Sequence, residues 1–259
     1  MIHQVGQQTV LLGDNLDVMP GITSRSFDLV VTSPPYNLGV RYGVHDDRLP
    51  LPDYFARLAQ AFDEIKRLLK DDGSFFLVVG SKSLVPWRAF EVAELAGRYF
   101  ALQNLIVWVK SVAIDGTTYG GNRPITSDRF LTGNHEFVLH FTKTGDVRVD
   151  RGAIAVDSAK VRNVIHYGMR PGERCLGNVW FVPHEYSGQR THPAPFPAAL
   201  VELCIKLHGL RPNLRLLDPW AGEGNALVAC ERLGVHGVGI EIDPAFVQRA
   251  TEKISRVAA

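Results

Sequence analysis

The segment LVVTSPPYN, residues 29–37, decides the fold of this chain. Its first three residues are apolar and do not alternate with polar ones, which is typical of a parallel strand buried on both faces. Pro34 and Pro35 end the strand, because proline has no N–H donor and a φ fixed at about −65°. Open α/β sheets bind their ligands at turns of this kind, at the carboxyl ends of parallel strands. The segment therefore predicts an α/β fold with a functional turn at residues 33–36.

The rest of the chain alternates strand and helix patterns. Apolar runs predict strands at 9–12, 74–80, 102–109, 135–141, 214–217 and 235–240. Helical spacing predicts helices from 53 to a glycine cap at Gly73, around 87–95, and at 197–207, 226–233 and 244–257. Such alternation predicts one domain over residues 1–259, with a mostly parallel sheet and helices on both faces.

Three segments lack this regularity. Residues 37–52 form a predicted loop beside the turn, a candidate lid that carries Arg41, Tyr42 and Arg48. Residues 111–134 are predicted to be irregular. Residues 143–190 have weak periodicity and a modest basic excess, with Arg162, Arg170 and aromatic residues such as Trp180 interspersed. Basic and aromatic residues together suit a nucleic-acid surface, although a polar insertion without a special partner has the same composition.

Composition excludes several classes of protein. The apolar fraction is 46% and the charged fraction 21%, as in ordinary globular domains. The 28 basic and 27 acidic residues nearly cancel, so binding to nucleic acid requires a local patch. No apolar run reaches membrane-spanning length, and neither a signal peptide nor a C-x-x-C pair is present, so we expect a cytoplasmic protein. No His/Cys cluster has metal-ligand spacing; the adjacent His135 and Glu136 are interpreted as structural.

The turn at residues 33–36 offers the groups that an exocyclic amine of a nucleobase needs. Such an amine is a weak nucleophile, because its lone pair is delocalised into the ring. The Ser33 hydroxyl and the Pro34 carbonyl supply two acceptors for its two N–H bonds, and Tyr36 supplies an aromatic face for the base. A proline-rich turn with a surface tyrosine is the plain alternative, so the interpretation requires a cofactor site elsewhere in the chain.

A second turn, DPWAGEGN at residues 218–225, meets that requirement. It lies between a predicted strand and a predicted helix, where glycine lets the backbone approach a ligand. Leu227 stands where a dinucleotide fingerprint has its third glycine, which argues against NAD. Glu241, at the end of the next strand, suits the two hydroxyls of a ribose or, alternatively, a helix cap. Asp14 likewise follows a strand and suits either a ligand or the cap of the next turn.

Together these motifs resemble the S-adenosylmethionine-dependent DNA amino-methyltransferases. The turn 218–224 resembles that family's cofactor loop, usually Asp-Pro-Phe-x-Gly-x-Gly, with Trp220 in place of phenylalanine. TSPPY at 32–36 matches the catalytic motif, Glu241 the ribose-binding acid, and Gly13-Asp14 the motif whose acid contacts the cofactor adenine. Segments at 134–143, 178–180 and 192–197 also look like family segments. Because the catalytic motif precedes the cofactor motif, the order is similar to the circularly permuted beta group.

The resemblance implies a Rossmann-like class I methyltransferase fold with a mostly parallel seven-stranded sheet, and S-adenosyl-L-methionine as cofactor. It implies Ser33, Pro34, Pro35 and Tyr36 as the catalytic residues. It implies as cofactor-binding residues Asp14, Thr32, Phe196, Asp218, Pro219, Trp220, Ala221, Gly222, Gly224, Asn225, Glu241 and Ile242. Residues 143–190 would recognise the DNA target, with Arg41, Tyr42, Arg48, Arg162 and Arg170 as candidate DNA contacts.

The expected reaction is methylation of the N4 amine of a cytosine flipped out of double-stranded DNA, because a serine in this motif is usual for cytosine. N6-adenine methylation is the alternative; methylation of an RNA base or a protein amide, a non-catalytic DNA-binding module and a nicotinamide dehydrogenase are weaker ones. A homodimer and a separate restriction endonuclease are expected partners. No metal is expected.

Overall fold

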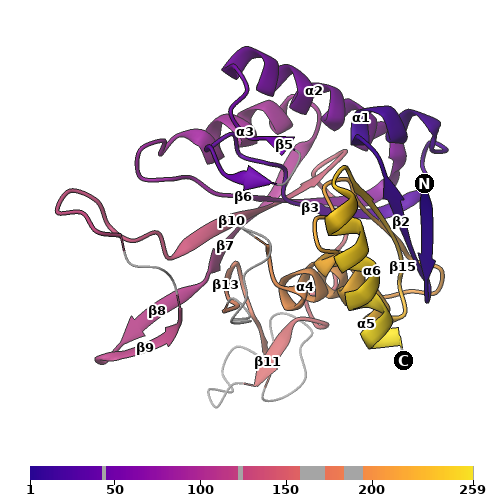
Figure 1. Ribbon diagram of the computed structural model, residues 1–259. Helices are drawn as coiled ribbons and strands as arrows, with labels where there is room; N and C mark the ends of the chain where they lie inside the picture. Colours follow the sequence, from indigo (N-terminus) through magenta and orange to yellow (C-terminus); the bar gives the residue numbers. More distant parts are fainter. Residues whose placement is uncertain (43–44, 122–124, 158–172, 184–194, 259) are drawn as a thin grey trace.

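The computed structural model describes residues 1–42, 45–121, 125–157, 173–183 and 195–258. Within these ranges the main sheet has nine strands in the order β1-β2-β15-β14-β3-β6-β10-β7-β13 (Figure 1). The strands are β1 (Ile2–Val5), β2 (Gln8–Leu12), β3 (Phe27–Thr32), β6 (Leu69–Val79), β7 (Ala101–Val109), β10 (His135–Thr142), β13 (Val179–Phe181), β14 (Arg215–Asp218) and β15 (His236–Glu241).

The centre of the sheet is parallel, as the apolar runs predict. β14 pairs in parallel with β3 and with β15, and β3 pairs in parallel with β6. All six residues of β3 are buried, because helices cover both faces of the sheet. The carboxyl ends of β3 and β14 therefore lie side by side, and these ends carry the two turns singled out in the sequence.

Two hydrophobic cores lie on opposite faces of the sheet. One is built on α1 (Asn15–Val18), α2 (Leu51–Leu68) and α3 (Arg88–Gly97), and the other on α4 (Ala198–His208), α5 (Asn225–Leu233) and α6 (Pro244–Ala258). Alternate residues of one strand enter different cores: Val30 packs toward the first helix group, and Leu29 and Val31 pack toward the second. Figure 1 shows the two groups separated by the sheet.

The sheet differs from the expected seven strands at its two edges. β1 adds an antiparallel strand beside β2, and β13 adds a short parallel strand beside β7. β10 runs antiparallel to both of its neighbours, β6 and β7. Periodicity alone does not give a strand's direction, so the sequence could not show this reversal. The predicted class, a mostly parallel α/β sheet with helices on both faces, is confirmed.

Two local expectations are wrong. The segment 111–134 contains the hairpin β8 (Ser111–Ile114) and β9 (Thr117–Gly120), which projects from the body in Figure 1. Its turn is Asp115-Gly116, and both residues have positive φ, which is the signal of a tight hairpin turn. The helix after Asp53 ends at Leu68 instead of at a cap on Gly73. Leu69 is already extended, and Gly73 lies inside β6.

The two candidate functional segments are also partly regular. Residues 37–52 contain the two-residue strands β4 (Arg41–Tyr42) and β5 (His45–Asp46), and their last residues begin α2. Residues 143–190 contain β11 (Ala155–Asp157), β12 (Glu173–Cys175) and β13. Trp180, expected at a nucleic-acid surface, lies fully buried in the core, because β13 joins the main sheet. Among the residues described, no helix is long and apolar enough to cross a membrane.

One buried polar chain crosses the sheet far from the turns. Asn104 Nδ2 donates to His140 Nδ1 at 2.9 Å, so His140 Nε2 carries hydrogen and donates to Ser74 Oγ at 3.0 Å. Ser74 Oγ lies 2.9 Å from His208 Nδ1 and donates to it. Burial lowers the pKa of both imidazoles to about 4, so both are neutral at pH 7.

Candidate active site

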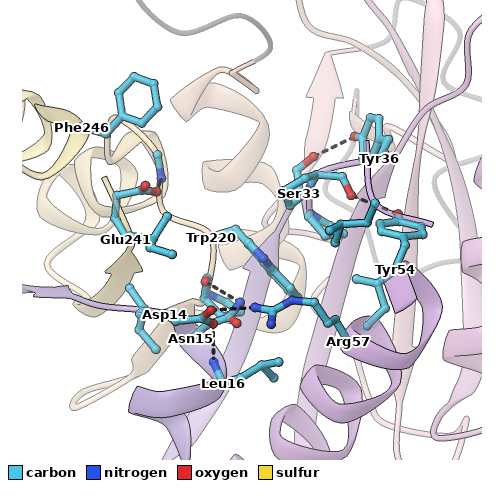
Figure 2. A pocket seen from close by; sticks show the side chains of 18 of the residues that line it. Asp14, Asn15, Leu16, Ser33, Tyr36, Tyr54, Arg57, Trp220, Glu241 and Phe246 are labelled. Carbon is cyan, nitrogen blue, oxygen red and sulfur yellow. Dashed lines mark hydrogen bonds and ion pairs between the residues drawn. The ribbon is translucent and has the colours of Figure 1, made fainter. Parts of the chain in front are cut away.

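A pocket joins the two turns. It is open at its mouth, and its free space with that mouth included is about 1080 Å³. The whole predicted catalytic turn, residues 33–36, lines it. Figure 2 shows Ser33 and Tyr36 on one side of the pocket, Glu241 and Phe246 on the other, and Trp220 between them. The predicted catalytic and cofactor regions therefore face one another.

The Ser33 hydroxyl has a defined direction. Tyr36 Oη lies 2.7 Å from Ser33 Oγ, and it donates toward the Val78 carbonyl at 3.1 Å and toward Glu136 Oε2 at 3.3 Å. A carbonyl and a carboxylate only accept, and a phenol has one hydrogen to give. The hydrogen between Ser33 and Tyr36 therefore comes from Ser33. Its remaining lone pairs are left to accept a hydrogen bond from a ligand.

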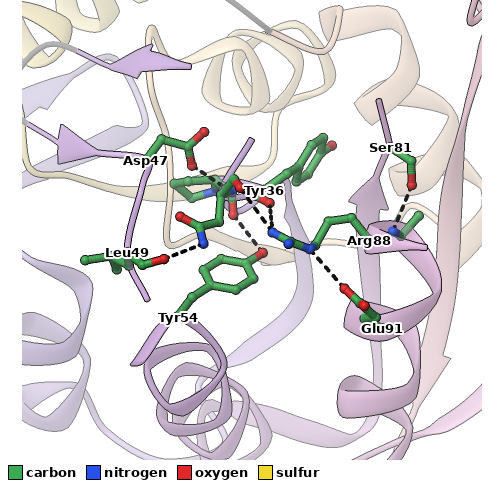
Figure 3. A network of polar contacts seen from close by, with 10 residues as sticks. Tyr36, Asp47, Leu49, Tyr54, Ser81, Arg88 and Glu91 are labelled. Atoms are coloured by element: carbon green, nitrogen blue, oxygen red, sulfur yellow. Dashed lines mark hydrogen bonds and ion pairs between the residues drawn. The ribbon is translucent and has the colours of Figure 1, made fainter. Parts of the chain in front are cut away.

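The catalytic turn is held by side chains that surround it (Figure 3). Tyr54 Oη of α2 donates to the Pro35 carbonyl at 3.0 Å. Arg88, buried at the start of α3, donates to the carbonyls of Tyr36 at 2.6 Å and Asn37 at 3.2 Å. The buried Asp47 accepts from the backbone N–H groups of Asn37 at 2.7 Å and Leu38 at 3.0 Å. These contacts fix the backbone after Pro34.

The Pro34 carbonyl is different. Within the described ranges, no donor of the protein bonds to it, whereas the Pro35 and Tyr36 carbonyls are occupied. Pro34 lines the pocket, so its carbonyl is a backbone acceptor of this turn that is left for a ligand.

The second turn brings backbone close to the pocket. Gly222 and Gly224 have φ of 51° and 78°, values that favour glycine. A Cβ on Gly224 would lie 2.8 Å from the Cβ of Ala250 on α6, so this position also has no room for a side chain. Gly222 N donates to Glu241 Oε2 at 2.8 Å, and Asp243 N donates to Oε1 at 2.8 Å. The Glu241 carboxylate is thereby fixed at the pocket wall, while burial raises its pKa.

Asp218 lies beneath the pocket and is fully buried. Thr32 Oγ1 donates to Asp218 Oδ1 at 2.6 Å, and Trp220 N donates to the same oxygen at 3.1 Å. Burial raises the pKa of Asp218 to about 7. Its other oxygen, Oδ2, has no hydrogen-bond partner in the part of the chain that the structure describes.

Asp14 has one of the two roles that the sequence left open, and its position leaves room for the other. Its Oδ1 accepts from Leu16 N at 3.0 Å and so caps α1, while its Oδ2 lies 2.6 Å from Arg57 of α2. It also lines the pocket, together with Arg57. The capping role is confirmed, and the carboxylate stands at the pocket wall as the cofactor interpretation requires.

These residues fit S-adenosylmethionine. Glu241 and Asp14, which pairs with Arg57, place carboxylate oxygens on the wall of the cofactor half. Such oxygens suit ribose hydroxyls and a cationic sulfonium, and Asp218 adds a buried carboxyl oxygen beneath them. Trp220, Ile242 and Phe246 supply the apolar surface that an adenine ring would bury.

The predicted residues divide into two groups. Six of the predicted cofactor residues line the pocket: Asp14, Pro219, Trp220, Gly222, Glu241 and Ile242. Six lie behind it or beside it: Thr32, Phe196, Asp218, Ala221, Gly224 and Asn225. Of the second group, Thr32 and Asp218 bond to each other, and Asn225 Nδ2 donates to the Phe196 carbonyl at 2.8 Å. The second group therefore supports the walls of the pocket.

The predicted DNA contacts remain predictions. Arg48 is exposed and does not line the pocket. Arg41 and Tyr42 are the two residues of strand β4. Arg162 and Arg170 lie outside the described residues.

The sequence missed several pocket residues. Tyr54 and Arg57 come from α2, where their spacing indicated only a helix, and Asn15 donates to the Pro219 carbonyl at 3.1 Å. Glu136, which was interpreted as structural, lines the pocket beside Tyr36 and pairs with Lys110 at 2.7 Å. In the sequence, Glu136 stands near the start of a predicted strand. Because β10 runs antiparallel to β6, the start of β10 lies at the edge of the sheet that carries the catalytic turn.

Comparison with known proteins agrees with this site. M.BglII, a Type II methyltransferase of Bacillus subtilis, is 30% identical over 261 residues, covering 94% of this chain and 68% of that protein. TTHA0409 of Thermus thermophilus, solved in complex with S-adenosyl-L-methionine, is 25% identical with a TM-score of 0.66, covering 96% of this chain and 93% of that one.

The cytosine-N4-specific PvuII DNA methyltransferase shares 19% identity and a TM-score of 0.69, over 98% of this chain and 92% of its own, and shows the fold alone. A sequence profile of DNA methylases matches residues 27–252. The resemblance found in the motifs is confirmed: the chain belongs to the DNA methylase family.

Proposed function

We propose that this protein transfers a methyl group from S-adenosylmethionine to the N4 amine of a cytosine in double-stranded DNA. The observation that carries the proposal is the pair of acceptors at the catalytic turn. Ser33 Oγ has its hydrogen directed to Tyr36, and the Pro34 carbonyl has no donor in the described structure. Two acceptors on consecutive residues of the pocket wall match in number the two N–H bonds of an exocyclic amine.

The residues of the chain act mainly by positioning. Ser33 and Pro34 would hold the amine so that its nitrogen lone pair points toward the cofactor half of the pocket. Bound S-adenosylmethionine supplies an electrophilic methyl group on a sulfonium. Correct placement of two reactants supplies a large part of the acceleration of such a reaction. Since an amine inside a duplex cannot reach this pocket, the base must flip out of the stack.

The choice of cytosine over adenine rests on Ser33. The family's adenine enzymes usually carry an acidic or amide side chain at this position, and the serine form is usual for cytosine. N6-adenine is the second candidate, because an adenine amine presents the same two N–H bonds. The pair of acceptors is compatible with both bases.

Nucleoside analysis tests the proposal. Purified protein is incubated with S-adenosylmethionine and unmethylated genomic DNA, and the DNA is digested and analysed by mass spectrometry. N4-methylcytosine is the expected product. N6-methyladenine would overturn the choice of base and keep the reaction class, and no methylated base would overturn the DNA substrate.

We further propose four features of this protein and its biological setting. Bacterial Type II methyltransferases are among the relatives, which supports a restriction–modification role beside a separate endonuclease, in the cytoplasm. Residues 143–190 would recognise the DNA target, and residues 37–52 would close over the bound base. A homodimer would allow two copies to share a short target site. Among the described residues, no group of His, Cys, Asp or Glu is arranged to hold a metal ion.

A further inference from the structure

The geometry points to Glu136 as a positioning residue of the methyl transfer, which acts on the amine through Tyr36 and Ser33. The inference rests on the proposed function. It assigns to Glu136 two linked tasks: to fix Ser33 as a hydrogen-bond acceptor, and to take up the proton that the amine loses.

The contacts form a directed chain. Ser33 Oγ lies 2.7 Å from Tyr36 Oη, and Tyr36 Oη lies 3.3 Å from Glu136 Oε2. Lys110 Nζ lies 2.7 Å from the other oxygen, Glu136 Oε1. Because Lys110 occupies Oε1, the oxygen that faces the phenol is Oε2. The Ser33 hydrogen therefore points toward Tyr36, and the Tyr36 hydrogen is shared between the Val78 carbonyl at 3.1 Å and Glu136 Oε2 at 3.3 Å.

The fold makes room for this carboxylate at the catalytic edge. Glu136 is the second residue of β10 and pairs with Trp108 on β7. The next residue of β10 pairs with Val79, the last residue of β6, so Glu136 lies at the end of β6. Gly80 follows β6 immediately, and a Cβ there would lie 2.8 Å from Glu136 Cγ. The glycine thus leaves the space that Glu136 fills. The side chain is 21% exposed, so Glu136 can return a proton to water.

The reaction needs such an acceptor. When the amine nitrogen forms its bond to the methyl carbon, the carbon–sulfur bond breaks and its electron pair neutralises the sulfonium. The nitrogen then carries the positive charge and one hydrogen too many. That proton passes to Ser33 Oγ, the Ser33 proton passes to Tyr36 Oη, and the Tyr36 proton passes to Glu136 Oε2. The charges balance, because one cation and one carboxylate are both neutralised.

Three variants test the inference. Glu136→Gln keeps the size of the side chain and removes its capacity to take a proton. Tyr36→Phe keeps the aromatic ring and removes the connecting oxygen. Gly80→Ala keeps the carboxylate and displaces it. Glu94→Gln on α3 is the matched control, because Glu94 is an exposed acid that pairs with the exposed Arg98.

The measurement is the single-turnover rate of methyl incorporation into unmethylated genomic DNA, with affinities for S-adenosylmethionine and DNA measured separately. We expect the first three variants to lower the rate about 100-fold, which is the lower end of the range for proton-transfer groups, and to keep both affinities within about twofold. The rate of Glu136→Gln should rise more steeply with pH than that of the native enzyme, because hydroxide replaces the missing acceptor.

A merely structural role for Glu136 would lower thermal stability or affinity and leave the pH profile unchanged. An unchanged rate in Glu136→Gln and Tyr36→Phe would overturn the inference while the native enzyme still methylates DNA. If the native enzyme produces no methylated base, the proposed function fails and the inference fails with it. If Glu136→Gln does not fold, Tyr36→Phe and Gly80→Ala decide.

Discussion

Thr32 donates its hydroxyl to Asp218 across 2.6 Å, and this one bond joins the last residues of two neighbouring strands, β3 and β14. The catalytic turn begins directly after Thr32, and the cofactor turn begins at Asp218. The relative position of the two halves of the site is therefore set by a buried contact between strand ends that are 186 residues apart in sequence.

The first prediction concerns this bond. Thr32→Val keeps the shape of the side chain and removes the hydroxyl, so Asp218 loses one donor in a buried site. We expect a loss of about 1–3 kcal/mol in the free energy of unfolding, measured by urea denaturation. Thr9→Val is the control, because the Thr9 hydroxyl makes an exposed bond to Gln4. Equal stability of the two variants would show that the buried bond contributes nothing.

The second prediction separates the two halves of the pocket. Ser33→Ala removes an acceptor of the amine and should lower turnover about 100-fold, with little change in cofactor affinity. Glu241→Ala and Asp218→Ala should weaken binding of S-adenosylmethionine about tenfold or more, as measured by calorimetry. Equal loss of cofactor binding in Ser33→Ala would contradict this division of roles.

The third prediction distinguishes the two roles of Asp14. Asparagine caps a helix as well as aspartate does, so Asp14→Asn should keep the cap on α1 and the thermal stability. It removes the negative charge that faces Arg57 and the pocket, and should weaken cofactor binding about tenfold. Asp14→Ala should also lose about 1 kcal/mol of stability. Unchanged cofactor affinity in Asp14→Asn would leave Asp14 as a helix cap alone.

The fourth prediction concerns Arg88, which holds the Tyr36 and Asn37 carbonyls from α3. Arg88→Lys keeps the charge, but Arg88 Nη1 donates to both carbonyls while Nε donates to Glu91 at 3.0 Å, and the single ammonium nitrogen of a lysine cannot reproduce this arrangement. We expect a decrease in turnover of about tenfold and a loss of about 1–3 kcal/mol of stability. Arg98→Lys, at the exposed carboxyl end of the same helix, should change neither. Normal turnover in Arg88→Lys would show that the turn keeps its shape without the guanidinium.

The fifth prediction is a pH dependence of stability from His140 and His208. Burial lowers the pKa of both imidazoles to about 4, below the ordinary value of 6.5. Between these values the unfolded chain binds more protons than the folded chain, so stability falls as the pH falls from 6.5 toward 4 and is unaffected above 6.5. Each histidine contributes at most about 3 kcal/mol to this loss.

Denaturation at pH 7 and pH 5 tests this dependence. His140→Gln should be less stable at pH 7 and should lose less stability between the two values than the native protein does. The exposed His236→Gln should leave the dependence unchanged. An equal slope in native protein and His140→Gln would contradict the assignment. Asp218 acts in the opposite direction, since its pKa is raised to about 7, so only the difference between variants isolates the histidines.

The two turns and the strands that carry them could be predicted because their signals are local. Three apolar residues before two prolines, and glycines at positions with positive φ, have one structural interpretation each. The contribution of α2 to the pocket wall could not be predicted. Tyr54 and Arg57 have ordinary helical spacing, which indicates a helix but not which of its side chains line a pocket. The burial of Trp180 could not be predicted either, because a large aromatic residue in a polar segment suits a surface and a core equally. The pairing of β13 with β7 buries it.

The reversed direction of β10 has a consequence for how such enzymes can diverge. β7 ends at Val109 and β10 begins at His135, opposite each other at the same edge of the sheet as Ser33. Everything between them, the β8–β9 hairpin included, leaves and re-enters the sheet at that edge. An insertion or a deletion in this segment would leave the strands of the main sheet in register, while altering the surface beside the catalytic turn. The length and shape of this surface can therefore change without any change in the strands that carry the two turns.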